Sequence, residues 1–443
     1  MRQKNESLAK QLYTMSWPMV IGMLAIMSCQ LIDSAFIGQL GSQQLAAVGF
    51  SIPVYQIVIG VQVGLGIATT TVISTTLGQK NTKHASELGF LVLLSGFFLV
   101  STICLLIWLN QQTILSILGA SSELFPMVKE YWQPWLISCL IGAMLYFGCS
   151  IFRAHGDTFV PGMAMVFASI LNIILDPILI FYLDMGIRGA AWATSISFVV
   201  SGMIVFSLLI TRKRVEPVYH WHTIKNALSR LMSYMAPSML SQFTPPISAM
   251  IALSIVASYG DIAVATWGLG SRLELLSIII VLSLTMALPP MIGRLRGLGD
   301  IESIDRLVKI AVSFIIKLQL IIALALVITA TPLTGLLTSD QEIIKLLDLY
   351  LWIVPISYSA LGVCMIMVSV CSAIGVPKLA LAISIIRLFG CYIPLLWLGS
   401  ITFGLTGLFT GATIANVLAG FISWRMYRKH FNTLLKRQYS TTN

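Results

Sequence analysis

Twelve long apolar runs divide this sequence, and they limit its fold more than any other feature. A helix needs about twenty apolar residues to cross a hydrocarbon core of about 30 Å. Only 10% of the 443 residues are charged, against about 25% in soluble proteins, and no alternating strand pattern indicates a β-barrel. We therefore predict an all-α membrane protein with spans near residues 12–38, 47–77, 86–109, 126–152, 160–183, 189–211, 229–259, 263–292, 307–330, 347–373, 379–398 and 404–424.

The distribution of the 27 Lys and Arg residues predicts the orientation of these spans. With the N-terminus inside, the inner segments hold 20 of them and the outer segments only Lys129, Arg188 and Lys345. The positive-inside rule then places both termini in the cytoplasm. Because no basic stripe carries interleaved aromatic residues, the net charge of +10 is not expected to reflect nucleic-acid binding. The first apolar run has no cleavage site and is expected to remain as a membrane helix.

Metal binding and enzymatic chemistry are not expected from the remaining residues. The seven cysteines fall inside apolar segments without metal-ligand spacing, as small core residues do. His220 and His222 stand two residues apart in a hydrophilic segment, where a solvated loop is the simpler interpretation. No nucleophile and base arrangement, HExxH motif or phosphate loop is present, so neither an enzyme nor a bound cofactor is expected.

The two halves of the sequence resemble each other. Matching residues recur at an offset of 218 or 219, in the pairs Pro18 and Pro237, Gly41 and Gly260, Gly156 and Gly375, and Gly186 and Gly404. Six spans in each half make both halves enter the membrane in the same sense, as a parallel repeat. We expect an N-terminal lobe (1–211), a cytoplasmic linker (212–230) and a C-terminal lobe (231–443). Folds of this kind usually transport a substrate that binds between the halves, although a scaffold is the alternative.

Two acids lie inside predicted spans of the first half. Asp33 and Asp176 each stand a few residues from the outer end of an outward-running helix, so they lie at similar depth. Asn172 is one turn from Asp176 on the same face, and Pro177 leaves the carbonyl of Ile173 without its helical donor and bends the helix. Gln30, about one turn from Asp33, faces this site or makes a packing contact.

Such a polar pocket suits proton or cation binding. Burial favours the neutral form of a carboxyl group, and a second carboxylate nearby favours it further. A site of this kind can take up a proton outside and release it inside. The alternative is that each aspartate only caps a helix or bonds a neighbouring hydroxyl. Pro18, with Gly22 nearby, is expected to let the first helix bend and to move Asp33.

The second half carries a different set of charges. Its positions equivalent to the two aspartates are apolar, near Ala252 and Ile393. It has instead a possible ionic cluster, within which Lys317 or Arg387 is expected to pair with Glu274 because Arg272 does not share its helix face. A structural ion pair between helices is the favoured interpretation, and a second relay or a substrate contact is the alternative. The cluster consists of Glu274, Arg272, Lys317 and Arg387.

These segments resemble the multidrug and toxic compound extrusion (MATE) family over nearly the whole chain. The resemblance rests on IDSAFIGQLGSQQLAAVGFS (32–51), GQKN (78–81), FRAHGDTFVPGMAMVFASILNIILDPILIF (152–181) and GIRGAAWATSIS (186–197), with weaker copies in the second half. The spacing of Asp33 from Pro18, the LDP segment and GSRLELL (270–276) are most similar to the DinF-like branch.

The resemblance implies a V-shaped pair of six-helix lobes in a prokaryotic inner membrane. It implies export of cationic or amphipathic drugs, and hence antibiotic resistance, by antiport against H⁺ or Na⁺. Residues matching the family pattern would have these roles: Asp33, Asp176, Asn172 and Thr194 in ion coupling, Tyr131 in the substrate cavity, and Pro18 at the bend.

Two departures from the family pattern favour protons over sodium and the N-terminal lobe over the C-terminal one. Cys149, which we expect at the substrate cavity with Gln30 and Tyr131, stands where relatives have an asparagine in the polar cluster, which weakens a sodium site more than a proton site. Thr244, Pro245 and Pro246 replace a glutamate of another branch. The alternative function is a flippase for a lipid-linked saccharide, which should have a cationic cavity. We expect a monomer.

Overall fold

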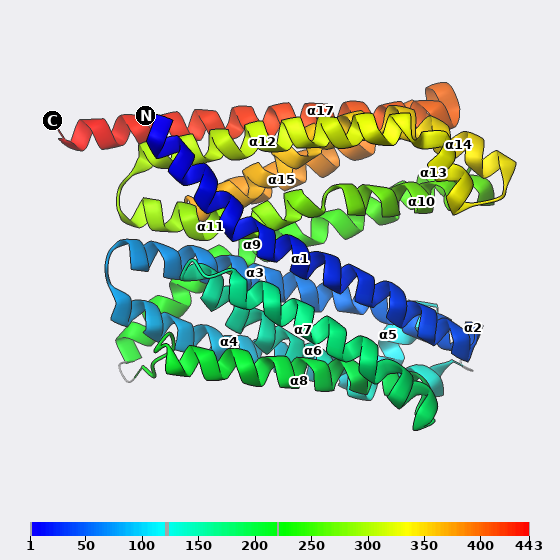
Figure 1. The fold of residues 1–443 in the computed structure, drawn as a ribbon, viewed down its shortest axis with the longest axis horizontal. Coiled ribbons are helices and arrows are strands. Elements are labelled where there is room, and N and C mark those ends of the chain that lie inside the picture. Colours follow the sequence, from blue (N-terminus) through cyan, green and yellow to red (C-terminus); the bar gives the residue numbers. More distant parts are fainter. Residues whose placement is uncertain (1, 120–123, 219–220, 443) are drawn as a thin grey trace. The chain divides into compact units, whose positions relative to one another are not determined.

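The computed structural model describes residues 2–119, 124–218 and 221–442, which form helices joined by short turns (Figure 1). No β-strand occurs among them. Contacts divide the chain into two compact units, which we call the N unit (Tyr13–Met239) and the C unit (Leu240–Asn443 with Met1–Leu12). His220 lies outside the described residues.

The N unit is organised around one central helix, α6, which packs against α3, α4 and α8, while α7 packs against α8. Trp132, Phe147 and Phe152 of α6 are fully buried. A Cβ atom on Gly96 of α4 would lie 2.4 Å from the Phe147 ring, so this glycine lets the two helices approach closely. The elements are α1 (Arg2–Leu40) from Tyr13 onward, α2 (Ser42–Gly49), α3 (Ser51–Gly78), α4 (Thr82–Leu109), α5 (Gln111–Ile117), α6 (Phe125–Ala154), α7 (Phe159–Pro177), the π-helical η1 (Ile178–Tyr182), α8 (Gly186–Thr211) and the start of α9 (Trp221–Ala257).

The C unit repeats this plan around α15, which packs against α11, α12, α16 and α17. Tyr358 and Met367 of α15 are fully buried. The unit contains the end of α9, α10 (Asp261–Ser277), α11 (Ile279–Gly297), α12 (Ile301–Ile328), α13 (Ala330–Leu337), α14 (Gln341–Ile353), the 3₁₀ turn η2 (Pro355–Ser357), α15 (Tyr358–Ala373), α16 (Pro377–Ile385), the π-helical η3 (Ile386–Tyr392) and α17 (Ile393–Thr442).

The glycines that recur in the sequence repeat have a common backbone role. Each adopts a positive φ, a conformation that residues with a side chain rarely adopt. Three turns of the first half therefore have the same unusual geometry as their copies in the second half, which is a structural reason for the repeat. The φ angles are +132° and +92° for Gly41 and Gly260, +82° and +92° for Gly156 and Gly375, and +55° and +60° for Gly186 and Gly404.

The described residues form twelve spans, in agreement with the sequence, although some of their ends and joins differ from the prediction. By length and composition the described residues give eleven candidate spans, the last of which runs over Pro377–Leu435. This stretch contains non-helical backbone at Phe403 and Gly404 and so holds the two final spans. The expected span 263–292 is divided between α10 and α11. Buried Gln319 of α12 donates to the Ser277 carbonyl over 2.9 Å, next to this break.

The segment between the units is more helical than the sequence predicts. The sequence predicts a linker over 212–230, followed by a separate span. The structure instead begins α9 at Trp221 and continues it without a break to Ala257. Only residues 212–218 of the expected linker are both described and non-helical.

Candidate functional site

The two acids predicted within the first half come together in the N unit. Asp33 lies on α1, and Asp176 lies at the end of α7, where it is fully buried. The charge of Asp33 acts on Asp176, and the charges of both aspartates act on the Cys29 thiol. Residues 143 positions apart in the chain therefore form one cluster, as the sequence analysis expected.

Asn172 links three helices at the centre of this cluster. Its Oδ1 accepts a hydrogen bond from the Cys29 Sγ of α1 over 2.8 Å. Its Nδ2 donates to Asp176 Oδ1 and to Thr194 Oγ1 of α8, each over 3.3 Å. The Thr194 hydroxyl itself donates to the Ala190 carbonyl over 3.0 Å, which leaves its oxygen free to accept. Both donors and the acceptor of Asn172 are thus in use.

One oxygen of each aspartate has no such partner. Asp33 Oδ1 and Asp176 Oδ2 are buried, and neither has a hydrogen-bond partner within the described part of the chain. A buried carboxylate without partners is costly unless it takes up a proton or meets a cation. Nothing in the cluster supplies a Lys or Arg side chain for this purpose. The arrangement is therefore suited to binding and releasing a proton or a small cation.

The backbone next to Asp176 departs from a regular helix, as the proline there predicts. Pro177 has no N–H, so it cannot bond the carbonyl of Ile173, and the chain widens into the π-helical turn η1 directly afterwards. A Cβ on Gly189 of α8 would lie 2.6 Å from the Leu179 backbone, so only glycine permits this packing. π-Turns of this kind occur frequently at functional sites.

The three residues predicted for the substrate cavity do not all lie in one place. Tyr131 is buried and stacked on Trp135, with ring centroids 6.2 Å apart, and both aspartates act on it electrostatically. Gln30 has an exposed side chain, and its carbonyl accepts from Ser34. The prediction that Cys149 lies in the aspartate cluster is wrong. Cys149 stands five residues before the end of α6, beside Arg153. The chain turns there into α7, and Asp176 lies about 25 Å farther along that helix.

The proline predicted to bend α1 lies against a glycine of α7. A Cβ on Gly162 would be only 2.4 Å from the Pro18 carbonyl oxygen, and one on Gly22 would be 2.9 Å from the Met165 sulfur. The two helices therefore touch through one glycine on each of them, Gly22 on α1 and Gly162 on α7. The proposed bend of α1 at Pro18 is therefore in direct contact with α7, the helix that carries Asp176.

Gly162→Ala is expected to lower stability and efflux together. Its new methyl group would overlap the Pro18 backbone, and overpacking of this kind costs about 1–3 kcal/mol. The control is Gly202→Ala on α8, where the nearest atoms, of Phe206, are 3.9 Å from the new Cβ. Thermal unfolding in detergent and cellular efflux measure both effects, and equal behaviour of the two variants would rule out the contact as a constraint.

The charged cluster of the C unit is centred on Glu274 and is rich in tyrosine. Tyr350 donates to Glu274 Oε2 over 3.4 Å, and the charges of Glu274 and Arg387 act on each other. Tyr358 and Tyr392 also interact electrostatically with Glu274. The sequence analysis missed these three tyrosines, since single tyrosines in apolar runs give no periodic signal.

Only one of the three basic residues predicted for this cluster lies beside Glu274. Arg272 and Lys317 have exposed side chains, and neither acts on the glutamate. Lys317 is therefore not its partner. Arg387 reaches it from the π-helical turn η3, which ends shortly before Pro394. Pro394 cannot donate to the Gly390 carbonyl, so a proline accompanies the π-turn in both units.

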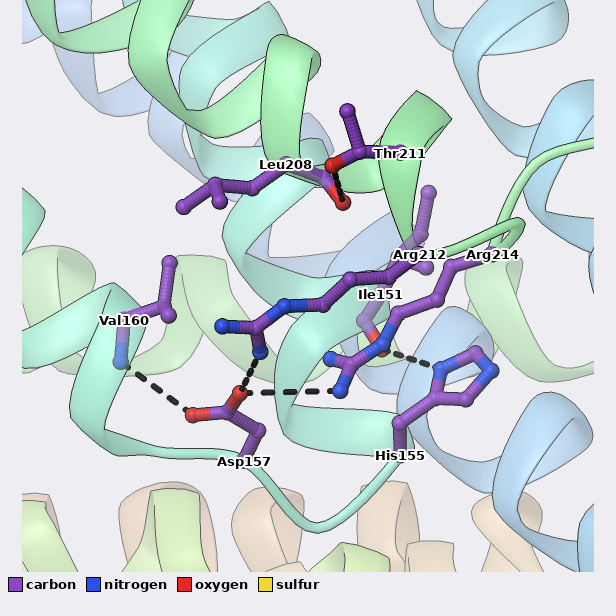
Figure 2. A network of polar contacts seen from close by, with 8 residues as sticks. All are labelled: Ile151, His155, Asp157, Val160, Leu208, Thr211, Arg212 and Arg214. Carbon is purple, nitrogen blue, oxygen red and sulfur yellow. Dashed lines mark hydrogen bonds and ion pairs between the residues drawn. The ribbon is translucent and has the colours of Figure 1, made fainter.

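A second polar network fastens the segment after α8 to the N unit (Figure 2). Asp157 Oδ2 lies 2.8 Å from Arg212 Nη1 and 3.5 Å from Arg214 Nη2, and its Oδ1 accepts from the Val160 N–H at the start of α7. The Arg214 guanidinium lies 4.5 Å from the Phe152 ring centroid. Asp157 thus joins the α6–α7 turn to the chain that leads out of α8.

Two further contacts complete this attachment. Ser86 of α4 donates to the Lys213 carbonyl over 2.9 Å, and its own carbonyl accepts from the Glu216 N–H. Burial lowers the pKa of His155, so its ring is neutral near pH 7, and Nδ1–H donates to the Ile151 carbonyl over 2.8 Å. The segment over 212–216 is therefore a fixed part of the N unit.

Asp157→Ala is expected to lower the free energy of unfolding by about 1–2 kcal/mol, because it loses the hydrogen bond from the Val160 N–H and the two ion pairs. It should also speed trypsin cleavage after Arg212, Lys213 and Arg214. The matched control is Glu130→Gln, which removes the exposed Arg188–Glu130 pair at 3.4 Å. Limited proteolysis followed by mass spectrometry measures the cleavage, and equal rates for both variants would contradict a fastening role.

Within the described residues, no group of three or more His, Cys, Asp or Glu side chains comes close enough to hold a metal ion. The aspartate cluster of the N unit contains two carboxylates and one amide, and two of its carboxylate oxygens lack a partner among the described residues.

The chain is similar to known proteins over most of its length. The family model described as MatE matches residues 18–178 and 237–398, one stretch in each half. The chain is 30% identical over 419 residues to a FAD transporter of Shewanella oneidensis, covering 93% of each. It is 26% identical over 418 residues to the multidrug export protein MepA of Staphylococcus aureus, covering 92% of this chain and 91% of that protein.

Solved structures agree over nearly the whole chain. The Vibrio cholerae MATE transporter VcmN in the bent form is 48% identical, with a TM-score of 0.95, over 97% of this chain and 98% of that one. A MATE structure in the straight conformation is 26% identical, with a TM-score of 0.90, over 97% of each chain.

Proposed function

Because the chain belongs to the MatE family of transporters, we propose that it is a secondary active exporter that exchanges protons for cationic or amphipathic small molecules. The observation that carries this proposal is the pair of aspartates in the N unit, each with a buried oxygen that lacks a partner among the described residues. A proton gained or lost there changes the charge of a buried site, and the surrounding helices must respond to that change.

In the proposed cycle the pair takes up a proton from outside and releases it to the cytoplasm. The driving force is about 2.3 kcal/mol per charge for each 100 mV, with about 1.4 kcal/mol for each pH unit. Protonation removes the repulsion between Asp33 and Asp176 and allows α1 to bend at Pro18. Relatives solved in bent and straight forms support a conformational change of this kind.

Protons are favoured over sodium by the shortage of oxygen ligands in the cluster. A sodium ion needs several oxygens around it, but Asn172 Oδ1 is occupied by the Cys29 thiol. The Asn172 amide nitrogen points toward Asp176 and Thr194 and cannot bind a cation. A proton needs one carboxylate oxygen. Cys149, which was expected to affect the choice of ion, lies near the end of α6 and does not contribute a ligand to the cluster.

Cationic and amphipathic cargo is favoured by the sign of the buried charges. Two carboxylates in the N unit attract cations while ionised and would repel a pyrophosphate. A lipid-linked saccharide, the alternative cargo, carries such a group, as does FAD, which a relative is named for. We also propose that the chain acts as a monomer in a prokaryotic inner membrane with both termini in the cytoplasm, without a bound cofactor.

Cells lacking their own drug pumps test this function directly. Expression of the chain should lower the accumulation of a fluorescent cation such as ethidium and raise resistance to it. Export of FAD is measured in the same cells from flavin fluorescence of the medium. Flavin export with unchanged ethidium accumulation would contradict the proposed cargo and would favour an anionic one.

A further inference from the structure

A cavity of about 470 Å³ lies in the N unit between the first turns of α4 and α9. It is lined by buried Leu88 and Ala227 and by polar side chains of both helices. This cavity is separate from the aspartate cluster, which belongs to α1, α7 and α8. Both of its helices begin membrane spans, at Thr82 and at Ile224.

The walls of this cavity carry two cations without partners. His84 Nδ1 lies 3.3 Å from Glu87 Oε2, so the one carboxylate of the cavity is already engaged. The ammonium of Lys83 on α4 and the guanidinium of Arg230 on α9 make no hydrogen bond or ion pair in the part of the chain that the structure describes. Two such donors, one from each helix, match the oxygens of a phosphate group, which Arg and Lys bind by charge-assisted hydrogen bonds.

The depth of the cavity identifies the source of that phosphate. Its residues belong to the first two turns of two membrane spans, and therefore to the boundary between hydrocarbon and headgroups. The phosphates of the bilayer lie at this level, and basic pockets between helices there bind anionic headgroups. We propose that this cavity binds the phosphate of an anionic phospholipid through Lys83 and Arg230.

A lipid bound there would connect the N unit to the helix that leaves it. α9 continues from this cavity past Met239, the last residue of the N unit, to Ala257. The lipid would hold its first turn to α4, so occupancy of the cavity fixes the starting point of the helix that joins the units.

Native mass spectrometry of the purified full-length chain tests this inference with phosphatidylglycerol and phosphatidylcholine as probes. The double variant Lys83→Gln with Arg230→Gln should lose its preference for phosphatidylglycerol at least tenfold. Tenfold corresponds to about 1.4 kcal/mol. The matched control is Lys378→Gln with Lys429→Gln, which removes two exposed charges outside the cavity. Arg230→Lys keeps the charge and should keep the preference.

Excess sodium phosphate distinguishes a lipid from a soluble anion. We expect it to leave bound phosphatidylglycerol largely in place. Equal lipid preference in the two double variants would contradict the proposal. The lipid assignment would also be wrong if inorganic phosphate bound the cavity while the unmodified chain showed no preference for phosphatidylglycerol.

Discussion

Asp176→Asn and Asp33→Asn should each abolish drug efflux, with resistance falling to that of cells without the protein. Asparagine keeps the size of the side chain and its hydrogen bonds but cannot take up or release a proton. Asp176 is fully buried, and Asp33 has a buried oxygen without a partner among the described residues. No other group at either position can therefore take up and release the proton. Dye accumulation in pump-deficient cells measures the loss.

The control for this experiment is Asp184→Asn, which removes an exposed carboxylate from the same unit. Asp184 lies in the turn after η1 with a φ of +51°, a conformation that asparagine also tolerates. Surface expression must be equal for all three variants. Normal efflux in both Asp33→Asn and Asp176→Asn would contradict the assignment of these residues to ion coupling.

Pro18→Ala should leave the protein folded but reduce efflux about tenfold, a barrier change of about 1.4 kcal/mol. Alanine restores a backbone N–H and a strong helix former in the middle of α1, which stiffens the helix. The bend that moves Asp33 then becomes harder to reach. Efflux rates normalised to surface expression measure this effect.

The control for Pro18→Ala is Pro126→Ala at the start of α6, where a helix has no hydrogen bond for the proline to interrupt. We expect normal efflux from this variant. If Pro18→Ala also exported at the normal rate, the first helix would not need its proline to move, and the proposed cycle would have to place the motion elsewhere.

Much of the fold can be predicted from the sequence, because the length of an apolar run is enough to identify a membrane helix. Long apolar runs identify the spans without knowledge of their partners. The even number of spans in each half gives a parallel repeat. The turn glycines repeat because each occupies a positive φ. The break between α10 and α11 lies beside a tertiary hydrogen bond from Gln319, which no local pattern reveals.

The aspartate cluster could be predicted for a related reason. A carboxylate in an apolar run stands out, and equal depth on two helices brings two of them together. Asn172 followed from one-turn spacing. The position of Cys149 was predicted wrongly, because it was inferred from similarity to relatives. Cys149 lies near the C-terminal end of α6, away from the aspartates.

The C unit was harder to predict because its polar site depends on packing between distant helices. Glu274 was visible in the sequence, but its tyrosine neighbours come from α14, α15 and η3. Choosing among Arg272, Lys317 and Arg387 required knowledge of which faces meet. A structural ion pair remains the prediction for this cluster, with a part in transport as the alternative. Membership of the DinF-like branch also remains a prediction.

Proton coupling through the aspartate pair is the central claim, and transport by the purified chain in lipid vesicles tests it most directly. A pH gradient imposed without sodium should drive movement of a fluorescent cation, and the Asp33→Asn and Asp176→Asn proteins should show no movement. A sodium gradient at equal pH should drive none. Movement that required sodium, or that persisted in both variants, would contradict the account.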